Sequence, residues 1–215
     1  MPQPSKTPSK PEPKQYRSIQ TRRRILAAAA VIFDRHGYEA ATMAQILQQA
    51  KMTKGALYFH FTSKEELSRA IVAEQFNWMA EGDLTSGSPM QSLIDLTHMF
   101  ATALREDTLV RAGIRLVVEQ SFVRGDARPY LGWIETARGL LEAANTEGWL
   151  RAGVDVPGVA EMLVGSFTGI QLTSQVLTGR KDLHQRLVAF WNAMLPGLVI
   201  ENRLSDLSPA GSRTA

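Results

Sequence analysis

Two short helical patterns stand close together in the first third of the chain, and no other feature limits the possible fold as strongly. Thr42 can cap a helix over residues 43–50, because its hydroxyl can accept a hydrogen bond from a backbone N–H of the first turn. After a turn at residues 51–52, Thr53 can cap a second helix over residues 54–59. With a longer helix before them, this order predicts a helix-turn-helix.

The longer helix is predicted over residues 18–36. Its apolar residues at positions 25, 26, 29, 32 and 33 recur at helical spacing and share one face. Gly37 is suited to end the helix, since glycine adopts the left-handed conformation of a helix terminus without strain. The arginines at positions 22–24 place positive charge where it opposes the helix dipole, so we expect an external anion to bind them.

The rest of the chain also carries helical patterns. Ser63 and Glu66 form a capping-box signature that opens a helix over residues 63–81, and a Gly-, Ser- and Pro-rich linker follows at residues 82–89. No window shows sustained alternation of period two. Further helices are predicted over residues 90–105, 109–123, 130–147, 157–177 and 183–200. The sequence therefore predicts an all-α protein with about nine helices.

Composition and charge divide the chain into four parts. We expect a disordered basic arm over residues 1–15, a helix-turn-helix domain over 16–62, a larger helical domain over 63–202 and a disordered tail over 203–215. Residues 1–64 hold 11 Lys and Arg against 3 Asp and Glu, although the whole chain has a net charge of only +3. Such a local excess is typical of a module that binds nucleic-acid phosphates. A charged but merely solvated start of the chain is the alternative.

Several classes of protein are disfavoured by the composition. The chain has no cysteine, which excludes disulfides, cysteine-based zinc sites and thiol nucleophiles. Its four histidines are scattered, and no H-E-x-x-H, G-x-S-x-G or glycine-rich phosphate loop occurs. We therefore expect no enzyme activity, no metal and no cofactor. No apolar stretch approaches the roughly 20 residues of a membrane helix, and a signal-peptide pattern is lacking, so we expect a cytoplasmic protein without a membrane partner.

The segment over residues 53–61 has the chemistry of a helix that enters the major groove of DNA. Gly55 and Ala56 permit close approach, and the polar side chains around them can contact phosphates or base edges. Thr42 and Lys64 stand at helix starts, where backbone N–H groups also bind phosphate. The predicted DNA contacts are Thr42, Thr53, Lys54, Gly55, Tyr58, His60 and Lys64.

Ordinary core packing is the alternative for the ring side chains of this segment. We assign Leu57 and Phe61 to the core, because they are four residues apart and share a face of the helix. Tyr58 and His60 are assigned to the surface. The pattern leaves Phe59 divided between the two and favours the core.

A specific set of motifs runs from residue 21 to residue 67. They are TRRRILAAA at its start, Gly37-Tyr38, Ala41-Thr42, TKGALYFHF at residues 53–61 and KEEL at its end. This stretch resembles the TetR-like family of bacterial transcriptional repressors. The resemblance implies an N-terminal helix-turn-helix, a C-terminal helical domain for ligand binding and dimerisation, and a homodimer on a palindromic operator. It also implies release from double-stranded DNA by a small molecule, with Lys64 at the position of a phosphate contact.

Three motifs in the C-terminal part carry a narrower resemblance. They are RAGIRL at residues 111–116, PYLGW at residues 129–133 and GSFTGIQ at residues 165–171. They are similar to the γ-butyrolactone (autoregulator) receptor branch of the family. The branch binds a signal with a polar five-membered ring and an alkyl tail, a butyrolactone, butenolide or furan, which implies control of secondary-metabolite genes. It also implies that Trp133 lines the ligand cavity.

Helical spacing and, for Val117, the resemblance supply the candidates for that cavity. A site for such a ligand needs apolar and aromatic walls with a few polar groups, and pairs three residues apart share a helical face. The predicted ligand-binding residues are Trp133, Tyr130, Phe76, Met79, Val117, Thr168 and Gln171. A plain helical core is the alternative for all of these apolar stripes.

The last two predicted helices are long and apolar, and they are candidates for a four-helix seam between two copies of the chain. Packing within one chain is the alternative for part of each helix. Two other functions stay open: a repressor of an efflux pump that senses diverse toxic compounds, and a helical enzyme that uses the C-terminal cavity.

Overall fold

The computed structural model describes residues 14–81 and 87–212, with side chains at positions 16–74, 87–121 and 125–212. In this part of the chain all regular structure is helical, apart from one isolated bridge between Leu150 and Val199. The elements are α1 (Lys14–Ala40), α2 (Met43–Ala50), α3 (Lys54–His60), α4 (Lys64–Glu81), α5 (Pro89–Glu106), α6 (Thr108–Arg124), α7 (Arg128–Thr146), α8 (Val156–Thr178), α9 (Leu183–Leu198) and the 3₁₀ helix η1 (Glu201–Asp206). The prediction of an all-α fold with about nine helices is confirmed.

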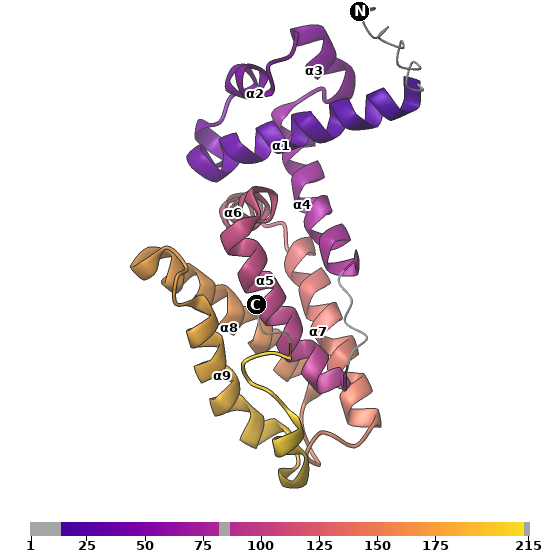
Figure 1. The fold of residues 1–215 in the computed structure, drawn as a ribbon, viewed down its shortest axis with the longest axis vertical. Coiled ribbons are helices and arrows are strands. Elements are labelled where there is room, and N and C mark those ends of the chain that lie inside the picture. Colours follow the sequence, from indigo (N-terminus) through magenta and orange to yellow (C-terminus); the bar gives the residue numbers. More distant parts are fainter. Residues whose placement is uncertain (1–13, 82–86, 213–215) are drawn as a thin grey trace, which may run out of the picture.

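Helices α1, α2 and α3 form the upper part of the molecule in Figure 1, and α4 leads from them to the remaining helices. Their shared core includes Ile25, Phe33, Ile46, Leu57 and Phe61, which are almost fully buried. The periodic apolar residues of three short sequence segments thus meet in one small core, and the charged faces of the helices turn outward.

The two threonine caps lie where the sequence predicts them. The Thr42 hydroxyl accepts a hydrogen bond from the backbone N–H of Gln45 at 3.2 Å, and the Gln45 side chain binds the Thr42 N–H in return. The Thr53 hydroxyl accepts from the N–H of Ala56 at 3.3 Å. Each short helix therefore begins at a fixed residue.

Helix α1 breaks at Gly37, the residue predicted to end it. Gly37 has a φ of 74° and a ψ of 179°, a conformation that side chains with a Cβ rarely adopt. The helix begins at Lys14, four residues earlier than predicted. Residues 1–13 of the expected basic arm lie outside the described part of the chain.

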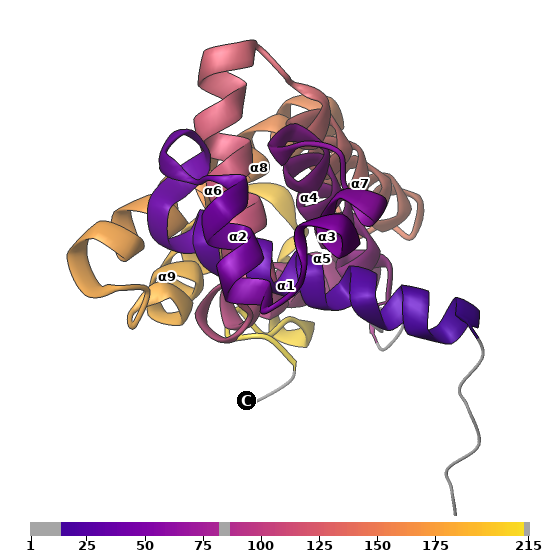
Figure 2. The ribbon, with the colours of Figure 1, turned by 90° about the horizontal axis from the view of Figure 1, so that it is seen from above.

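Helices α5 to α9 form the lower module. Helix α7 packs against α5 and α8, and α9 packs against the same two helices. Their common core surrounds the fully buried Trp191. Helix α6 packs against α5 but also against α1 and α4, and in Figure 2 it lies directly beneath the α1–α3 module. Together with α4, it therefore joins the two modules. No helix among the described residues is long and apolar enough to cross a membrane.

The end of the chain departs from the expectation of a disordered tail. Helix η1 is followed by a strap, residues 207–212, that crosses α5 (Figure 1). Leu207 is buried in the lower core, and the backbone N–H of Ser208 donates to the Gln91 side chain at 2.8 Å. The N–H of Ser212 donates to Asp95 at 2.8 Å. These polar anchors order a segment whose composition looks disordered; residues 213–215 lie outside the described part.

Candidate DNA-binding face and ligand cavity

Helix α3, the recognition helix, presents its predicted contact side chains away from the core. Thr53, Lys54 and Gly55 are exposed, and a Cβ added at Gly55 would meet no atom within 4 Å. Tyr58 is 41% exposed, with the Lys54 ammonium 5.8 Å from its ring centre. His60 is half-buried. These side chains form one polar surface, to which the exposed Thr42 at the start of α2 can add.

The preference for the core at Phe59, which the sequence leaves divided, is wrong. Its side chain is 81% exposed, whereas Leu57 and Phe61 are buried as predicted. Leu57 fills the core-facing side of a helix of only seven residues. Two positions further along a helix a side chain points to the opposite side, so Phe59 faces outward. An exposed phenylalanine on this face is suited to contact thymine methyl groups.

Lys64 does not point toward an external phosphate in the structure. Its ammonium donates to the carbonyl oxygens of Tyr38, Glu39 and Ala41 at 2.7, 3.2 and 2.9 Å. The same ammonium lies 4.4 Å from the Tyr38 ring centre. All three of its donors serve carbonyls near the end of α1, so Lys64 connects α4 to α1 and supports the DNA-binding module from within.

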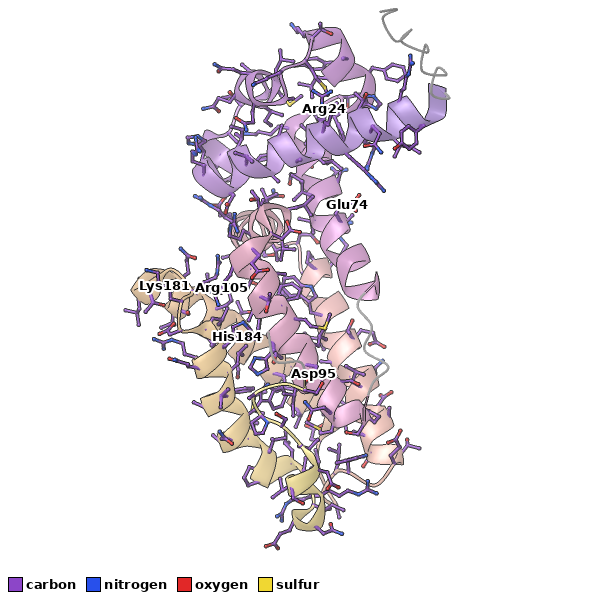
Figure 3. All side chains as sticks on the ribbon, viewed as in Figure 1. Arg24, Glu74, Asp95, Arg105, Lys181 and His184 are labelled. Atoms are coloured by element: carbon purple, nitrogen blue, oxygen red, sulfur yellow. The ribbon has the colours of Figure 1, made fainter. Side chains whose placement is uncertain are left out.

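The basic residues of α1 differ in what they contact. The guanidinium of Arg22 lies 5.3 Å from the Phe61 ring centre and 3.5 Å from a carboxylate oxygen of Glu74 on α4. Arg23 and Arg24 are exposed, and Figure 3 shows Arg24 on the α1–α3 module and Glu74 further along α4. Part of the predicted anion-binding charge is therefore already paired within the protein.

A cavity of about 90 Å³ lies between α5, α6, α7, α8 and α9. Its walls are mainly apolar and aromatic, with the rings of Phe100, Tyr130, Trp133 and Phe167 packed edge to face at centre distances of 5.2 to 6.3 Å. The polar side chains on its walls are Thr97, Tyr130, Thr136, Thr168 and Gln171. Burial raises the pKa of the Tyr130 phenol, so this hydroxyl keeps its proton. We call this space the central cavity.

Four of the seven predicted ligand residues line the central cavity: Trp133, Tyr130, Thr168 and Gln171. Val117 does not. It lies in a second hollow between α4 and α6, and its neighbour Val118 lines the central cavity instead. Consecutive side chains of a helix point about 100° apart, so Val117 and Val118 face different hollows. The side chains of Phe76 and Met79 lie outside the described ones.

Sequence reasoning missed several cavity residues, among them Phe100 and Trp191. Phe100 stands at the centre of the aromatic cluster, in contact with both Trp133 and Phe167. Its place in the sequence carries no motif, since a phenylalanine on the apolar face of α5 looks like any core residue. Only the meeting of α5 with α7 and α8 distinguishes it.

The two modules are joined by an ion pair and hydrogen bonds between α6 and the last part of α1. Arg111 binds the Asp34 carboxylate at 3.0 Å, and Arg115 donates to the Asp34 carbonyl at 2.7 Å. Glu119 accepts from the Tyr38 N–H at 2.8 Å. A Cβ at Gly37 would stand within 2.6 to 2.9 Å of Glu119 and Arg115 atoms. The contact is therefore close as well as polar, and α6, one of the five helices around the cavity, is bonded to the DNA-binding module.

This combination of modules matches known protein families. Residues 25–71 match the family described as bacterial regulatory proteins, tetR family, and residues 87–200 match the tetracyclin repressor-like C-terminal domain. The chain belongs to the tetR family of bacterial regulatory proteins. It is a regulator with a helix-turn-helix DNA-binding domain, and the prediction that it is not an enzyme is confirmed.

Among relatives, the A-factor receptor protein of Streptomyces griseus is 41% identical over 198 residues, which cover 92% of this chain and 71% of the relative. The structure of TylP, a TetR regulator from Streptomyces fradiae, has 41% identity and a TM-score of 0.79, covering 90% of this chain and 93% of that one. A γ-butyrolactone receptor (ArpA-like protein) has 33% identity and a TM-score of 0.74, covering 90% and 96%. The resemblance to the γ-butyrolactone receptor branch of this family is confirmed.

Proposed function

We propose that this tetR-family regulator is a cytoplasmic homodimeric repressor that binds a palindromic operator and is released by a small γ-butyrolactone-like, butenolide or furan signal. The observation that carries the proposal is the central cavity, an aromatic space whose α6 wall is bonded directly to the DNA-binding module. We include control of secondary-metabolite genes in the proposal, because the chain is also similar to a structure described as the molecular basis for control of antibiotic production by bacterial hormones.

The exposed side of α3 supports the DNA-binding half of the proposal. Thr53, Lys54, Gly55, Tyr58 and His60 supply donors, a cation and room for close approach. Phe59 adds an apolar surface for base methyl groups. We assign Lys64 to the support of α1, since its donors are already bonded, and we keep Thr42 as a phosphate contact at the start of α2.

The composition of the cavity wall supports the ligand half. A ring with an alkyl tail is mostly apolar, and it matches walls of aromatic and aliphatic side chains with few polar groups. The volume of about 90 Å³ is below the roughly 300 Å³ at which ligand sites begin. Entry of the ligand must therefore move side chains of the wall, to which α6 contributes Ile114 and Val118.

Movement of α6 supplies the step from ligand to DNA. Its ion pair with Asp34 and its bond to Tyr38 lie next to the break at Gly37, so a displaced α6 carries the end of α1 with it. A ligand acts in this way only if it binds the released conformation more tightly than the operator-bound one. A tenfold loss of operator affinity needs about 1.4 kcal/mol of coupling.

The test uses an operator selected by the protein from a pool of random-sequence duplexes, with binding followed by fluorescence anisotropy. Addition of an alkylated γ-butyrolactone is expected to weaken operator binding at least about tenfold, or about 1.4 kcal/mol. Trp133→Ala is expected to keep operator affinity and to lose most of the release. Leu131→Ala is the matched control, because Leu131 is exposed on the same helix and does not line the cavity.

Two results would contradict the proposal. One is full release of Trp133→Ala by the lactone, which would place the ligand elsewhere. The other is release by cationic dyes but by no lactone, butenolide or furan, which would favour a sensor of toxic compounds that controls an efflux pump.

A further inference from the structure

A buried arginine lies behind one wall of the central cavity. Arg180 follows the end of α8, has a φ of 65° and is only 8% exposed. Its Nη2 donates to the side-chain oxygen of Gln171 at 3.0 Å. Burial lowers the pKa of this guanidinium, Asp34 opposes that effect and Arg111 adds to it. In the described part of the chain no carboxylate forms an ion pair with Arg180, so Gln171 is its hydrogen-bond partner there.

The chemistry of the two groups determines which end of the amide faces the arginine. A guanidinium carries only donors, whereas a glutamine amide has an oxygen that accepts and a nitrogen that donates. The Gln171 oxygen must therefore face Arg180, and the amide nitrogen points the other way. Among the described residues this nitrogen has no hydrogen-bond partner. Gln171 is 1% exposed and lines the cavity, so its N–H groups border that space rather than bulk water.

The threonines on the cavity wall offer acceptors to a ligand, whereas the Gln171 amide nitrogen offers donors. Thr97, Thr136 and Thr168 donate their hydroxyl protons to carbonyls of their own helices, at 2.7, 3.0 and 2.8 Å. Their oxygens can then only accept from a ligand, and that of Thr97 already accepts from the Trp191 indole N–H at 3.0 Å. Gln171 thus offers donors to the cavity, as do the Tyr130 hydroxyl and the indole N–H of Trp133. A buried donor left without a partner costs free energy, so a bound ligand is expected to supply an acceptor there.

We propose that Arg180 is a positioning residue that holds the Gln171 amide with its N–H groups toward the cavity, and that this selects ligands with a carbonyl or carboxylate oxygen. The inference rests on the proposed function, because it concerns the ligand of the same cavity. The shared chemistry is an acceptor oxygen on a five-membered ring: a lactone carbonyl or a ring carboxylate. A ring that lacks this oxygen is discriminated against, since a site built to hydrogen-bond its ligand rejects analogues without the bonding group.

A ligand-free experiment tests the orientation by itself. Gln171→Glu is expected to raise the Tm by about 2–4 °C, because the carboxylate replaces the amide oxygen beside a buried cation. The gain must disappear when the same change is made in the Arg180→Met protein. Gln175→Glu, an exposed amide on the same helix, is the matched control and should show no such dependence on Arg180. A gain that persists without Arg180, or no gain, overturns the assigned orientation.

Binding experiments test the selectivity by calorimetry with three probes that share one alkyl chain: the γ-butyrolactone, the furan carboxylate and the tetrahydrofuran. The wild type is expected to bind one of the two probes with a carbonyl or carboxylate oxygen at least about tenfold more tightly than the tetrahydrofuran, which has only its ring ether oxygen. Gln171→Glu should abolish this ratio, because acceptor then faces acceptor. Arg180→Met should reduce the ratio severalfold while leaving tetrahydrofuran binding unchanged; Arg180→Lys, which keeps a donor, should restore part of it.

The outcomes separate this inference from the proposed function. If the lactone releases the operator but the ratio survives in Gln171→Glu and Arg180→Met, the inference is wrong and the proposed function stands. If no probe binds the wild type, the proposed function fails, and the selectivity inference fails with it even where the Tm cycle supports the orientation. Preference for the carboxylate over the lactone identifies the charged member of the acceptor class as the ligand.

Discussion

In the recognition helix, neighbouring aromatic residues have opposite surroundings. Phe61 is 2% exposed and packs in the upper core, whereas Phe59 is 81% exposed. Composition alone cannot separate them, because both are phenylalanines in one run of rings. Helical geometry does separate them. Leu57 and Phe61 are core residues four positions apart, and Phe59, midway between them, must face away from the core. The expectation that Phe59 favours the core follows from its residue type, whereas this geometry predicts an exposed side chain.

Substitution of the two rings is expected to separate binding from stability. Phe59→Ala should change the free energy of unfolding by no more than about 0.5 kcal/mol and weaken operator binding about tenfold, or about 1.4 kcal/mol. Phe61→Ala should cost about 3–5 kcal/mol of stability. Chemical denaturation and anisotropy titration measure the two quantities. Unchanged operator affinity in Phe59→Ala would remove this ring from the DNA contact.

Lys64 illustrates a limit of reasoning from local sequence. Its position at the start of α4 indicates a phosphate contact, but the carbonyls that it binds belong to residues 38–41, more than twenty positions earlier. The sequence does not show that α1 ends beside the start of α4. The same holds for Gln171, whose partner Arg180 is nine residues away across a turn.

At the scale of elements, helix positions follow from the sequence but the C-terminal strap does not. Each of the nine predicted helices corresponds to one of α1 to α9, because apolar period and capping residues are local properties. The strap is held by Gln91 and Asp95, 117 residues away in the chain. Its polar, proline- and glycine-containing sequence is typical of a disordered tail, and nothing local indicates those anchors.

Two histidines extend the anchoring of the strap. Nδ1 of His98 lies 2.9 Å from Nδ1 of His184, and Nε2 of His98 lies 3.0 Å from the Pro209 carbonyl. A carbonyl only accepts, so His98 donates there and its Nδ1 accepts from His184. Nε2 of His184 then accepts from the Thr102 hydroxyl at 3.3 Å. The chain of bonds is complete with both rings neutral; Figure 3 shows His184 and Asp95 on this side of the molecule.

Acid is expected to weaken this side of the lower module. Burial, and then the neighbouring His98 and Arg105, lower the pKa of His184, while Glu106 opposes them. The folded state thus binds the proton less readily than the unfolded one, so the stability from His184 is complete above the unfolded pKa of about 6.5 and is lost as the pH falls through it toward the folded value. The slope for one group is at most about 1.4 kcal/mol per pH unit.

Thermal unfolding between pH 7.5 and 5 measures this dependence. The decline should be smaller in His184→Asn, which cannot take up the proton. Asp182 and Asp126 do not interfere, because hydrogen bonds lower the pKa of both carboxyls and any stability they contribute is lost only at more acidic pH. An equal decline in wild type and His184→Asn would assign the acid sensitivity to other groups.

At the scale of the whole molecule, the order of the modules could be predicted, and the position of the cavity only in part. The helix-turn-helix and the all-helical remainder follow from helix lengths and charge. The position of the cavity depends on how five helices pack together. A shift of one residue along α6 decides whether a side chain lines it, as Val118 does, or the second hollow, as Val117 does. Residues whose motif carried a resemblance, such as Trp133, were found, and Phe100 and Trp191, which no motif marks, were missed.

The dimer interface is a property of the whole molecule. Helix α8 exposes large apolar side chains along its length, with Val176 83% and Leu177 63% exposed. Such residues are typical of a covered interface, and a four-helix seam of α8 and α9 with their symmetry mates would bury them. The seam would also set the distance between the two recognition helices, which must match successive turns of the major groove.

The double variant Leu172→Asp/Val176→Asp is therefore expected to sediment as a monomer at micromolar concentration, where the wild type is a dimer. Its Tm as a folded monomer should stay measurable, because both side chains lie outside the core of one chain. Operator affinity should fall at least about a hundredfold, or about 2.7 kcal/mol, since each half-site is then bound separately. Leu131→Asp, which places the same charge on an exposed leucine of α7, should remain dimeric. A double variant that still sediments as a dimer would place the interface on another face.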